Sequence, residues 1–256
     1  YLTETDHSLV GCTFTNNQAL TILASTSYVG GGAIFCSGNH SDGVPRTLNL
    51  DDCTFDGNQA WYGGAVRNLS GKIHITGSTF TNNATIGDNG DGGGIDLHSC
   101  EVGIANSTFD GNTADHLGGA ISLLYDCTEA AGLPAMENLQ LLNNTADGGG
   151  AVFIYDGSVA SMQGCTVTGN TSTGDGGAIL MSYGDATFTA CEFSNNNSTE
   201  SGGAIGFRDS TAIATNCQFS NNSSTDWNGG AISMTRSNVE LHTCSVLNNN
   251  TGDLGY

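Results

Sequence analysis

The chain has 256 residues, and it is rich in Gly (38) and poor in Pro (2). It carries 25 Asp and Glu against 5 Lys and Arg, which gives a formal net charge of −20. Such a surface repels nucleic-acid phosphates, so we do not expect nucleic acid as a partner. No apolar run approaches the roughly 18 residues of a membrane span, so we do not expect direct membrane insertion.

One pattern recurs along the chain with a period of about 26 residues. It begins with Gly-Gly-Ala and ends with an apolar anchor followed three residues later by Asn, as in residues 176–196, 202–222 and 229–249. Aligning the copies gives nine coils, whose anchors are Phe14, Phe55, Phe80, Phe109, Leu141, Val167, Phe193, Phe219 and Val246. The repeat leaves no room for a second globular unit, so residues 1–256 are interpreted as one repeat domain.

Short apolar alternations inside each coil predict β-strands, because side chains two apart on a strand share a face. In chain order the inward pairs include Leu48/Leu50, Cys53/Phe55, Ile73/Ile75, Val102/Ile104, Ile121/Leu123, Val152/Ile154, Ile179/Met181, Cys191/Phe193, Cys217/Phe219, Ile232/Met234 and Val239/Leu241. Stacking such coils buries the apolar face and pairs each strand with its equivalents. The prediction is an all-β, single-stranded parallel β-helix of about nine coils, with three short strands per coil.

Insertions interrupt the period at about residues 18–30, 36–46, 84–92 and 124–133. The loops 37–46 and 125–132 are candidate recognition surfaces, and tolerated surface decoration is the equally weighted alternative. Neither end of the sequence shows a capping element, which favours a piece of a longer array or subunits that stack end to end.

The Asn after each anchor is predicted to form a structural column. We expect it to adopt left-handed backbone angles and to hydrogen-bond the Asn of the next coil. The column comprises Asn17, Asn58, Asn83, Asn112, Asn144, Asn170, Asn196, Asn222 and Asn249.

Six of the 9 Cys occupy one slot, two residues before the anchor. Stacked coils bring neighbouring Cα atoms to about 4.8 Å, within disulfide range. The candidate pairs are Cys12 with Cys53, Cys165 with Cys191, Cys217 with Cys244 and, on another strand, Cys100 with Cys127. The alternative is that Cys acts as a compact apolar filler. No metal site is predicted, because the column has no Cys-x-x-Cys and the His are scattered.

Asn-x-Ser/Thr signals occur along the chain. Those within the Asn column are interpreted as structural. The better candidate acceptors of N-linked glycans, if the chain is secreted from a eukaryote, are Asn39, Asn68, Asn143 and Asn221.

The paired signals Gly-Gly-Ala-Ile/Val and Phe-x-x-Asn, as at 118–121 and 219–222, resemble the repeats of chlamydial polymorphic outer-membrane proteins and related pectate-lyase-like surface adhesins. The resemblance spans almost the whole chain. It implies a right-handed β-helix located outside the cell or on its surface, with a role in adhesion or surface structure. Leu141, Val167 and Val246 depart from Phe at the anchor, and Gly94 replaces the corner Ala.

The first functional hypothesis is a noncatalytic extracellular structural or adhesive solenoid without a cofactor, whose partners are copies of itself or a surface glycan or protein. The alternative is a polysaccharide lyase or glycosidase, which needs clustered carboxylates and a basic residue. Its candidate residues are Asp96, Asp156, Asp209, Arg67 and Arg208.

A third hypothesis is calcium binding by the acidic turns before the Gly-Gly corner, against which solvated turn Asp is the preferred interpretation. The residues concerned are Asp91, Asp147, Asp175 and Asp226. They lack the Gly-Gly-x-Gly-x-Asp spacing of calcium-binding nonapeptide repeats.

Overall fold

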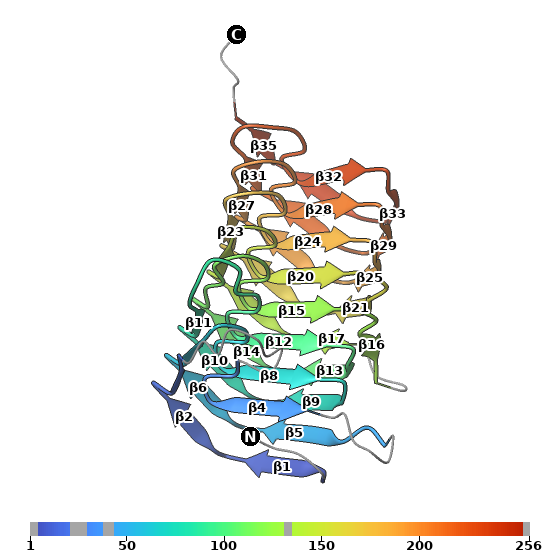
Figure 1. Cartoon of the computed structure of the whole chain (residues 1–256). Coiled ribbons are helices and arrows are strands. Elements are labelled where there is room, and N and C mark those ends of the chain that lie inside the picture. Colours follow the sequence, from blue (N-terminus) through green and yellow to red (C-terminus); the bar gives the residue numbers. More distant parts are fainter. Residues whose placement is uncertain (1–4, 21–29, 38–43, 131–134, 253–256) are drawn as a thin grey trace.

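The chain winds into a β-solenoid whose coils follow one another in sequence order along a single axis (Figure 1). The computed structural model describes residues 5–20, 30–37, 44–130 and 135–252, and these contain strands and turns without a helix. Neighbouring strands pair in parallel across successive coils. The predicted parallel β-helix is therefore confirmed.

Sheet A follows the Gly-Gly corner of each coil and has 8 strands. Its strands are β4 (Ile34–Ser37), β8 (Val66–Leu69), β12 (Ile95–His98), β15 (Ile121–Leu124), β20 (Val152–Tyr155), β24 (Ile179–Ser182), β28 (Ile205–Arg208) and β32 (Ile232–Thr235). The first and third residues of its central strands are buried in the core, such as Ile95 and Leu97 of β12 and Ile121 and Leu123 of β15. The outer face of this sheet carries the candidate site described below.

Sheet B comes next in each coil and has 10 strands. Its strands are β1 (His7–Val10), β5 (Thr47–Asp51), β9 (Lys72–Thr76), β13 (Glu101–Ala105), β16 (Thr128–Glu129), β17 (Met136–Glu137), β21 (Val159–Gln163), β25 (Asp185–Thr189), β29 (Thr211–Thr215) and β33 (Asn238–His242). Within its central strands buried and more exposed residues alternate, as in β5 and β25. This is the period of two that the sequence shows.

Sheet C contains the apolar anchors and has 9 strands. Its strands are β2 (Thr13–Thr15), β6 (Thr54–Asp56), β10 (Thr79–Thr81), β14 (Thr108–Asp110), β18 (Gln140–Leu142), β22 (Thr166–Thr168), β26 (Glu192–Ser194), β30 (Gln218–Ser220) and β34 (Ser245–Leu247). Each is a three-residue strand whose central residue points inward.

A fourth strand of two residues follows the column Asn, so the expectation of three strands per coil was wrong. These strands are β3 (Gln18–Ala19), β7 (Gln59–Ala60), β11 (Ala84–Thr85), β19 (Thr145–Ala146), β23 (Thr171–Ser172), β27 (Asn197–Ser198), β31 (Ser223–Ser224) and β35 (Asn250–Thr251). They form two short sheets, collectively sheet D, which Thr113 joins through single bridges. A two-residue strand is too short to produce an apolar alternation, which is why the sequence did not reveal it.

The core is built from columns of equivalent residues. In sheet C, Phe55, Phe80 and Phe109 pair in register, and their ring centroids lie 4.6 Å apart with nearly parallel planes. Leu141 continues the same column opposite Phe109. Because the side chains of the sheets converge on one interior, the core runs along the axis rather than forming a compact centre.

The Asn residues after the anchors form a hydrogen-bonded ladder. In the middle coils the backbone N–H and the Nδ2 of Asn83 both donate to Oδ1 of Asn112, at 3.0 and 2.9 Å. The Nδ2 of Asn83 also donates to the carbonyl of Phe55 at 3.0 Å. The same contacts recur from Asn17 to Asn249. Every polar group of an interior ladder amide is thereby satisfied although the residue is buried.

The left-handed residue of this turn is the one before the ladder Asn, which corrects our expectation. Positive φ occurs at Asn82 (54°), Gly111 (66°), Asn143 (52°) and Asn221 (56°), each one position earlier. Two consecutive residues of the turn therefore have different roles. An Asn or Gly reverses the chain, and the following Asn points inward to bond its neighbours.

The Gly-Gly corner brings successive backbones into close contact. Gly118 has φ of 67°, and a Cβ on Gly119 would lie 2.2 Å from the carbonyl oxygen of Gly150. Any side chain at the second glycine would push two coils apart.

The core columns are exposed at the C-terminal end of the described coils. Met234, Leu241 and Val246 are 56%, 45% and 48% exposed, although they continue columns that are buried one coil earlier. In the preceding coils the equivalent residues are covered by the next coil, whereas in this coil they are exposed together with the strand edges.

The ladder yields a test with an internal control. Asn112→Ala leaves the buried amide of Asn83 without its acceptor and the carbonyl of Phe80 without its donor. We expect the free energy of unfolding to fall by about 3 kcal/mol or more. Asn17→Ala, at an exposed end of the ladder, removes only the Nδ2 contact to Asn58 and should cost about 1 kcal/mol or less. Urea unfolding followed by circular dichroism measures both, and equal losses would contradict this account.

Candidate functional site

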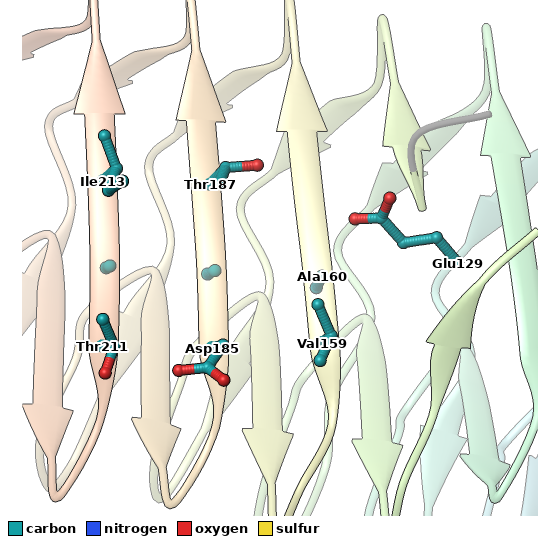
Figure 2. A pocket seen from close by; sticks show the side chains of 9 residues that line it. Glu129, Val159, Ala160, Asp185, Thr187, Thr211 and Ile213 are labelled. Atoms are coloured by element: carbon teal, nitrogen blue, oxygen red, sulfur yellow. The ribbon is translucent and has the colours of Figure 1, made fainter. Parts of the chain in front are cut away.

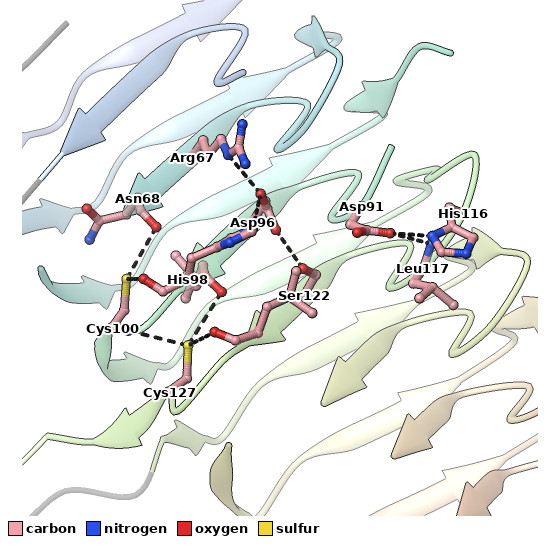
Figure 3. Close-up of polar contacts among 12 residues, drawn as sticks. Arg67, Asn68, Asp91, Asp96, His98, Cys100, His116, Leu117, Ser122 and Cys127 are labelled. Atoms are coloured by element: carbon pink, nitrogen blue, oxygen red, sulfur yellow. Dashed lines mark hydrogen bonds and ion pairs between the residues drawn. The ribbon is translucent and has the colours of Figure 1, made fainter. Parts of the chain in front are cut away.

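Four polar side chains meet on the outer face of sheet A (Figure 3). The carboxylate of Asp96 lies 3.0 Å from Nε of Arg67 and 3.1 Å from Nε2 of His98. Ser122 Oγ donates to its other oxygen at 2.7 Å. The parallel register brings three of these side chains together, because Arg67, Asp96 and Ser122 are register partners on β8, β12 and β15.

Three members of this cluster, Arg67, Asp96 and Ser122, are buried, and the side chain of His98 is 22% exposed. Asp96 is 0% and Arg67 is 4% exposed, and the guanidinium of Arg67 lies 4.4 Å from the ring centroid of Tyr62. A buried carboxylate needs such a full set of partners, since an unpaired buried charge is very costly. We interpret the cluster as a support beneath the surface rather than as a group that meets a ligand.

A second acidic group lies beside the cluster and reaches the surface. Asp91 Oδ1 accepts hydrogen bonds from Nδ1 of His116 at 2.9 Å and from the N–H of Leu117 at 3.1 Å. Burial and then the charge of Asp96 raise the pKa of the Asp91 carboxyl from 3.8 to about 6, against the opposing effect of His116. The side chain of His116 is 43% exposed.

Asp91 and His116 form one wall of a cavity of about 300 Å³, which we call the tyrosine pocket. Its lining consists of Asp91, His116, Leu117, Leu124, Tyr125, Phe153 and Tyr155. Tyr155 stacks on Phe153, with centroids 5.7 Å apart, and meets Tyr125 edge to face at 5.7 Å. Tyr125 is 46% exposed. An apolar cavity with a few converging polar groups is the usual form of a ligand site.

A larger groove of about 510 Å³ lies on sheet B. Figure 2 shows side chains of Val159, Asp185, Thr187, Thr211 and Ile213 standing side by side on neighbouring strands. The groove is lined without an aromatic ring. The tyrosine pocket is therefore the stronger candidate.

The predicted catalytic carboxylates do not converge. Asp96, Asp156 and Asp209 belong to coils that are two steps apart in the strand order of sheet A. Asp96 does meet Arg67, as the alternative function required, but it is buried. Arg208 instead pairs with Asp175, with Nε 3.0 Å from Oδ2, and Asp209 pairs with Arg236.

Three of the four Asp in the acidic turns accept specific hydrogen bonds, whereas the preferred interpretation was that these residues are only solvated. Asp91 binds His116, Asp175 accepts the N–H of Ser201 at 2.8 Å, and Asp147 accepts from Thr173. Only Asp226 stays exposed without a side-chain hydrogen bond in the described part of the chain. Among the described residues, no group of three or more His, Cys, Asp or Glu is placed to hold a metal ion.

All 9 cysteines are free thiols, and all but Cys36, which lies in β4, stand in turns between strands. All four candidate pairs join neighbouring coils, as Cys165 and Cys191 do before β22 and β26. The thiols also bond the backbone, since Cys53 Sγ donates to the carbonyl of Leu9 at 3.4 Å. Ser78 takes the same place one coil later and accepts the N–H of Cys53 at 3.0 Å. Cys here is a hydrogen-bonding turn residue as well as a filler.

The candidate glycosylation residues differ in exposure. Asn143 and Asn221 are exposed, whereas Asn68 is 0% exposed. The expectation for Asn68 was wrong because it occupies an inward position in register with Cys36 and Leu97. Asn39 lies outside the described residues.

Of the two candidate recognition loops, 125–132 contributes Tyr125 to the tyrosine pocket. Residues 131–134 and 38–43 lie outside the described residues, so most of loop 37–46 does too. His116, Phe153 and Tyr155 were missed by the sequence reasoning. The recurrence of Tyr at or just after the end of β15, β20 and β24 was the available signal.

Comparison with known families agrees with this architecture. A model described as a right-handed β-helix region matches residues 127–253. The chain is therefore a right-handed β-helix. A model of the Chlamydia polymorphic membrane protein repeat matches residues 11–37 and 106–123. The chain thus carries repeats of the chlamydial polymorphic membrane protein type.

Two curated proteins are similar over parts of the chain. The probable autotransporter YfaL of Escherichia coli K12 is 32% identical over 160 residues, which cover 54% of this chain and 12% of that protein. The probable outer membrane protein PmpA of Chlamydia trachomatis serovar D is 38% identical over 81 residues, which cover 30% of this chain and 8% of that protein. No solved structure matches the chain.

These relationships place the chain with extracellular or cell-surface proteins. Within the described residues, no helix has the length and apolar character to cross a membrane.

Disulfide formation stays a prediction, and intact mass checks it. Protein folded under oxidising conditions should weigh less by two hydrogen atoms per bridge, and reductant should restore the mass. Cys191→Ser should abolish one bridge, whereas Cys36→Ser should leave the number unchanged because Cys36 lies outside the paired columns. Identical masses before and after reduction would contradict the pairing.

Asp91 yields a pH prediction. Its raised pKa means that the folded chain holds this proton more tightly than the unfolded chain. The associated stability is complete below about pH 4 and is lost as the pH rises through about 6, a total of about 3 kcal/mol. Asp91→Asn avoids that loss, so it should exceed the parent in stability at about pH 7.5 and match it near pH 4.

Thermal unfolding at several pH values measures the difference. Asp88→Asn is the control, because Asp88 is an exposed residue of the neighbouring turn. An Asp91→Asn variant that is less stable than the parent at the higher pH would contradict the burial argument.

Proposed function

We propose that the chain is a noncatalytic, adhesive β-helix segment of a surface-exposed protein. The observation that carries the proposal is the unbroken parallel stacking along the described chain, together with repeats of the chlamydial polymorphic membrane protein type. Such a solenoid is a rigid rod, and binding surfaces on rigid scaffolds are held in fixed positions. The autotransporter and outer-membrane relatives support the same role.

The geometry of the carboxylates supports a noncatalytic role. Hydrolysis of a sugar bond needs two carboxyl groups that flank one open position. Asp96 has no exposed surface, and Asp156 and Asp209 stand on different coils. In our proposal these groups shape the surface and balance charge.

The chain would act as part of a longer array. The exposed core positions Met234, Leu241 and Val246 would then contact a further coil, supplied by the same chain or by a second copy. Sedimentation velocity at increasing concentration distinguishes these sources, since only the second makes the chain self-associate.

A glycosidase is the second candidate, and the state of Asp91 favours it. A carboxyl whose pKa is raised to about 6 beside an open pocket suits a general acid. The missing element is a second exposed carboxylate on the pocket, because the described lining contains Asp91 alone.

Adhesion and catalysis can be separated experimentally. Beads coated with the chain should adhere to cultured cells or to immobilised cell-surface glycoprotein at least about tenfold better than beads coated with an unrelated acidic protein of equal charge, because specific contacts must exceed nonspecific ones. The same preparation should release no reducing sugar from neutral or acidic polysaccharides. Adhesion equal to that of the control, or sugar release that Asp91→Asn abolishes, would overturn the proposal.

A further inference from the structure

We propose that the tyrosine pocket binds a neutral pyranose sugar presented by a surface glycan, an inference that rests on the proposed adhesive function. The pocket lies on the outer face of sheet A and opens between two walls. One wall comes from the turns that contain Asp91, His116 and Leu117, and the other from Tyr125 and Tyr155.

The aromatic wall offers ring faces in a fixed arrangement. Tyr155 is stacked on Phe153 with an interplanar angle of 18°, and Tyr125 stands across it at 81°. The backbone N–H of Tyr125 donates to the carbonyl of Tyr155 at 3.3 Å, so its backbone is held by the next coil. A pyranose presents a face of C–H groups with partial positive charge, which the negative face of an aromatic ring attracts.

The floor of the pocket is apolar and continuous with the coil surface. Leu124, Phe153 and Leu180 form a small cluster outside the main core, and Leu117 and Tyr155 pack against it. This cluster holds the aromatic wall in place without a ligand. A preformed surface avoids part of the entropy cost of binding.

The polar wall supplies hydrogen-bonding groups opposite the rings. Both bonds to Asp91 end on Oδ1, so in the described part of the chain Oδ2 has no hydrogen-bond donor. The side chain of Asp91 is 14% exposed and that of His116 is 43% exposed. A carboxylate oxygen accepts from sugar hydroxyls, and the second ring nitrogen of His116 can donate or accept. Hydroxyls on one edge and C–H groups on the other match a pyranose.

Charge selects a neutral sugar over an acidic one. The pocket lining contains Asp91 and neither Lys nor Arg, and the chain has a net charge of −20. The nearby guanidinium of Arg67 is buried against Asp96. A sugar carboxylate at this position would therefore face repulsion without a compensating cation.

The size of the pocket also restricts the ligand. A cavity of about 300 Å³ lies at the lower end of the range for small-molecule sites. It suits one sugar ring at the end of a glycan better than a long polysaccharide or a folded protein surface. The rest of the glycan would extend into solvent past Tyr125.

The test uses methyl glycosides of galactose, glucose and N-acetylglucosamine, with galacturonic acid as the acidic comparison. Ligand-observed NMR with the intact chain measures binding, and an array of the same sugars on a polymer amplifies weak affinity. We expect at least one neutral sugar to bind and the acidic sugar to bind at least about tenfold more weakly. No binding of any neutral sugar at millimolar concentration would overturn the proposal, as would a preference for the acid.

Variants locate the site. Tyr125→Ala should weaken neutral-sugar binding by about tenfold through loss of the ring face, and Asp91→Asn should weaken it by replacing a strong acceptor. Tyr183→Ala is the matched control, because Tyr183 is 54% exposed in the same row of tyrosines but lies outside the pocket lining. Circular dichroism confirms that each variant folds. Equal binding by Tyr125→Ala and Tyr183→Ala would overturn the assignment.

The outcome also separates this inference from the adhesive function. Adhesion of coated beads that persists in Tyr125→Ala and is insensitive to added sugar would refute the pocket while leaving adhesion intact. Sugar binding by a chain whose coated beads do not adhere would refute the adhesive function. Binding of an apolar peptide with no sugar binding would identify a different occupant and refute the inference.

Discussion

Each coil of this β-helix is held in register with the next because the buried side-chain amide of each ladder Asn finds its hydrogen-bond partners on the neighbouring coils. Asn112 accepts from Asn83 on one side and donates to Asn144 on the other, at 2.9 and 3.0 Å. A slip of one residue would replace these contacts with unsatisfied buried groups and would turn the strand faces inside out. Two further turns repeat the device with Cys and Ser, as where Cys127 receives the N–H of Cys100. The hydrogen bonds in the turns thus fix the register, and this register places the Phe rings where they stack.

The same register creates charge pairs on the outside. Arg67 and Asp96 face each other because their strands are neighbours, and Ser122 meets Asp96 for the same reason. Residues at equivalent positions of neighbouring coils therefore lie side by side whatever their type. The interior permits few such types, since each must fit the identical space above and below. The outer face can vary from coil to coil. Between β8 and β24 it changes from the polar cluster around Arg67 and Asp96 to the apolar cluster of Leu124, Phe153 and Leu180.

The sequence was sufficient to predict the repeating features that are marked by a recurring residue type. The anchors, the Gly-Gly corner and the Asn after each anchor occur often enough for their columns to be recognised without coordinates. Features that depend on a single coil were not predictable in this way. Nothing in the repeat shows that Asp96 is buried, because its burial depends on Arg67 and Ser122 from neighbouring coils. The Asn-x-Ser signal at Asn68 does not reveal that this residue fills an inward position in register with Leu97. The fourth strand could not be predicted because two residues are too few to show an apolar alternation.

This division explains where a binding site can arise in such a protein. Positions that repeat are committed to stacking, so a ligand site must be assembled from residues that break the pattern. The tyrosine pocket meets this condition. His116 and Leu117 belong to the turn before one corner, Asp91 comes from the turn one coil earlier, and Tyr125 follows the strand of its own coil. The stacked coils beneath them and the hydrogen bonds from His116 and Leu117 to Asp91 hold these residues in place. The rigidity of the repeat and the irregularity of its surface are therefore two results of the same stacking constraint.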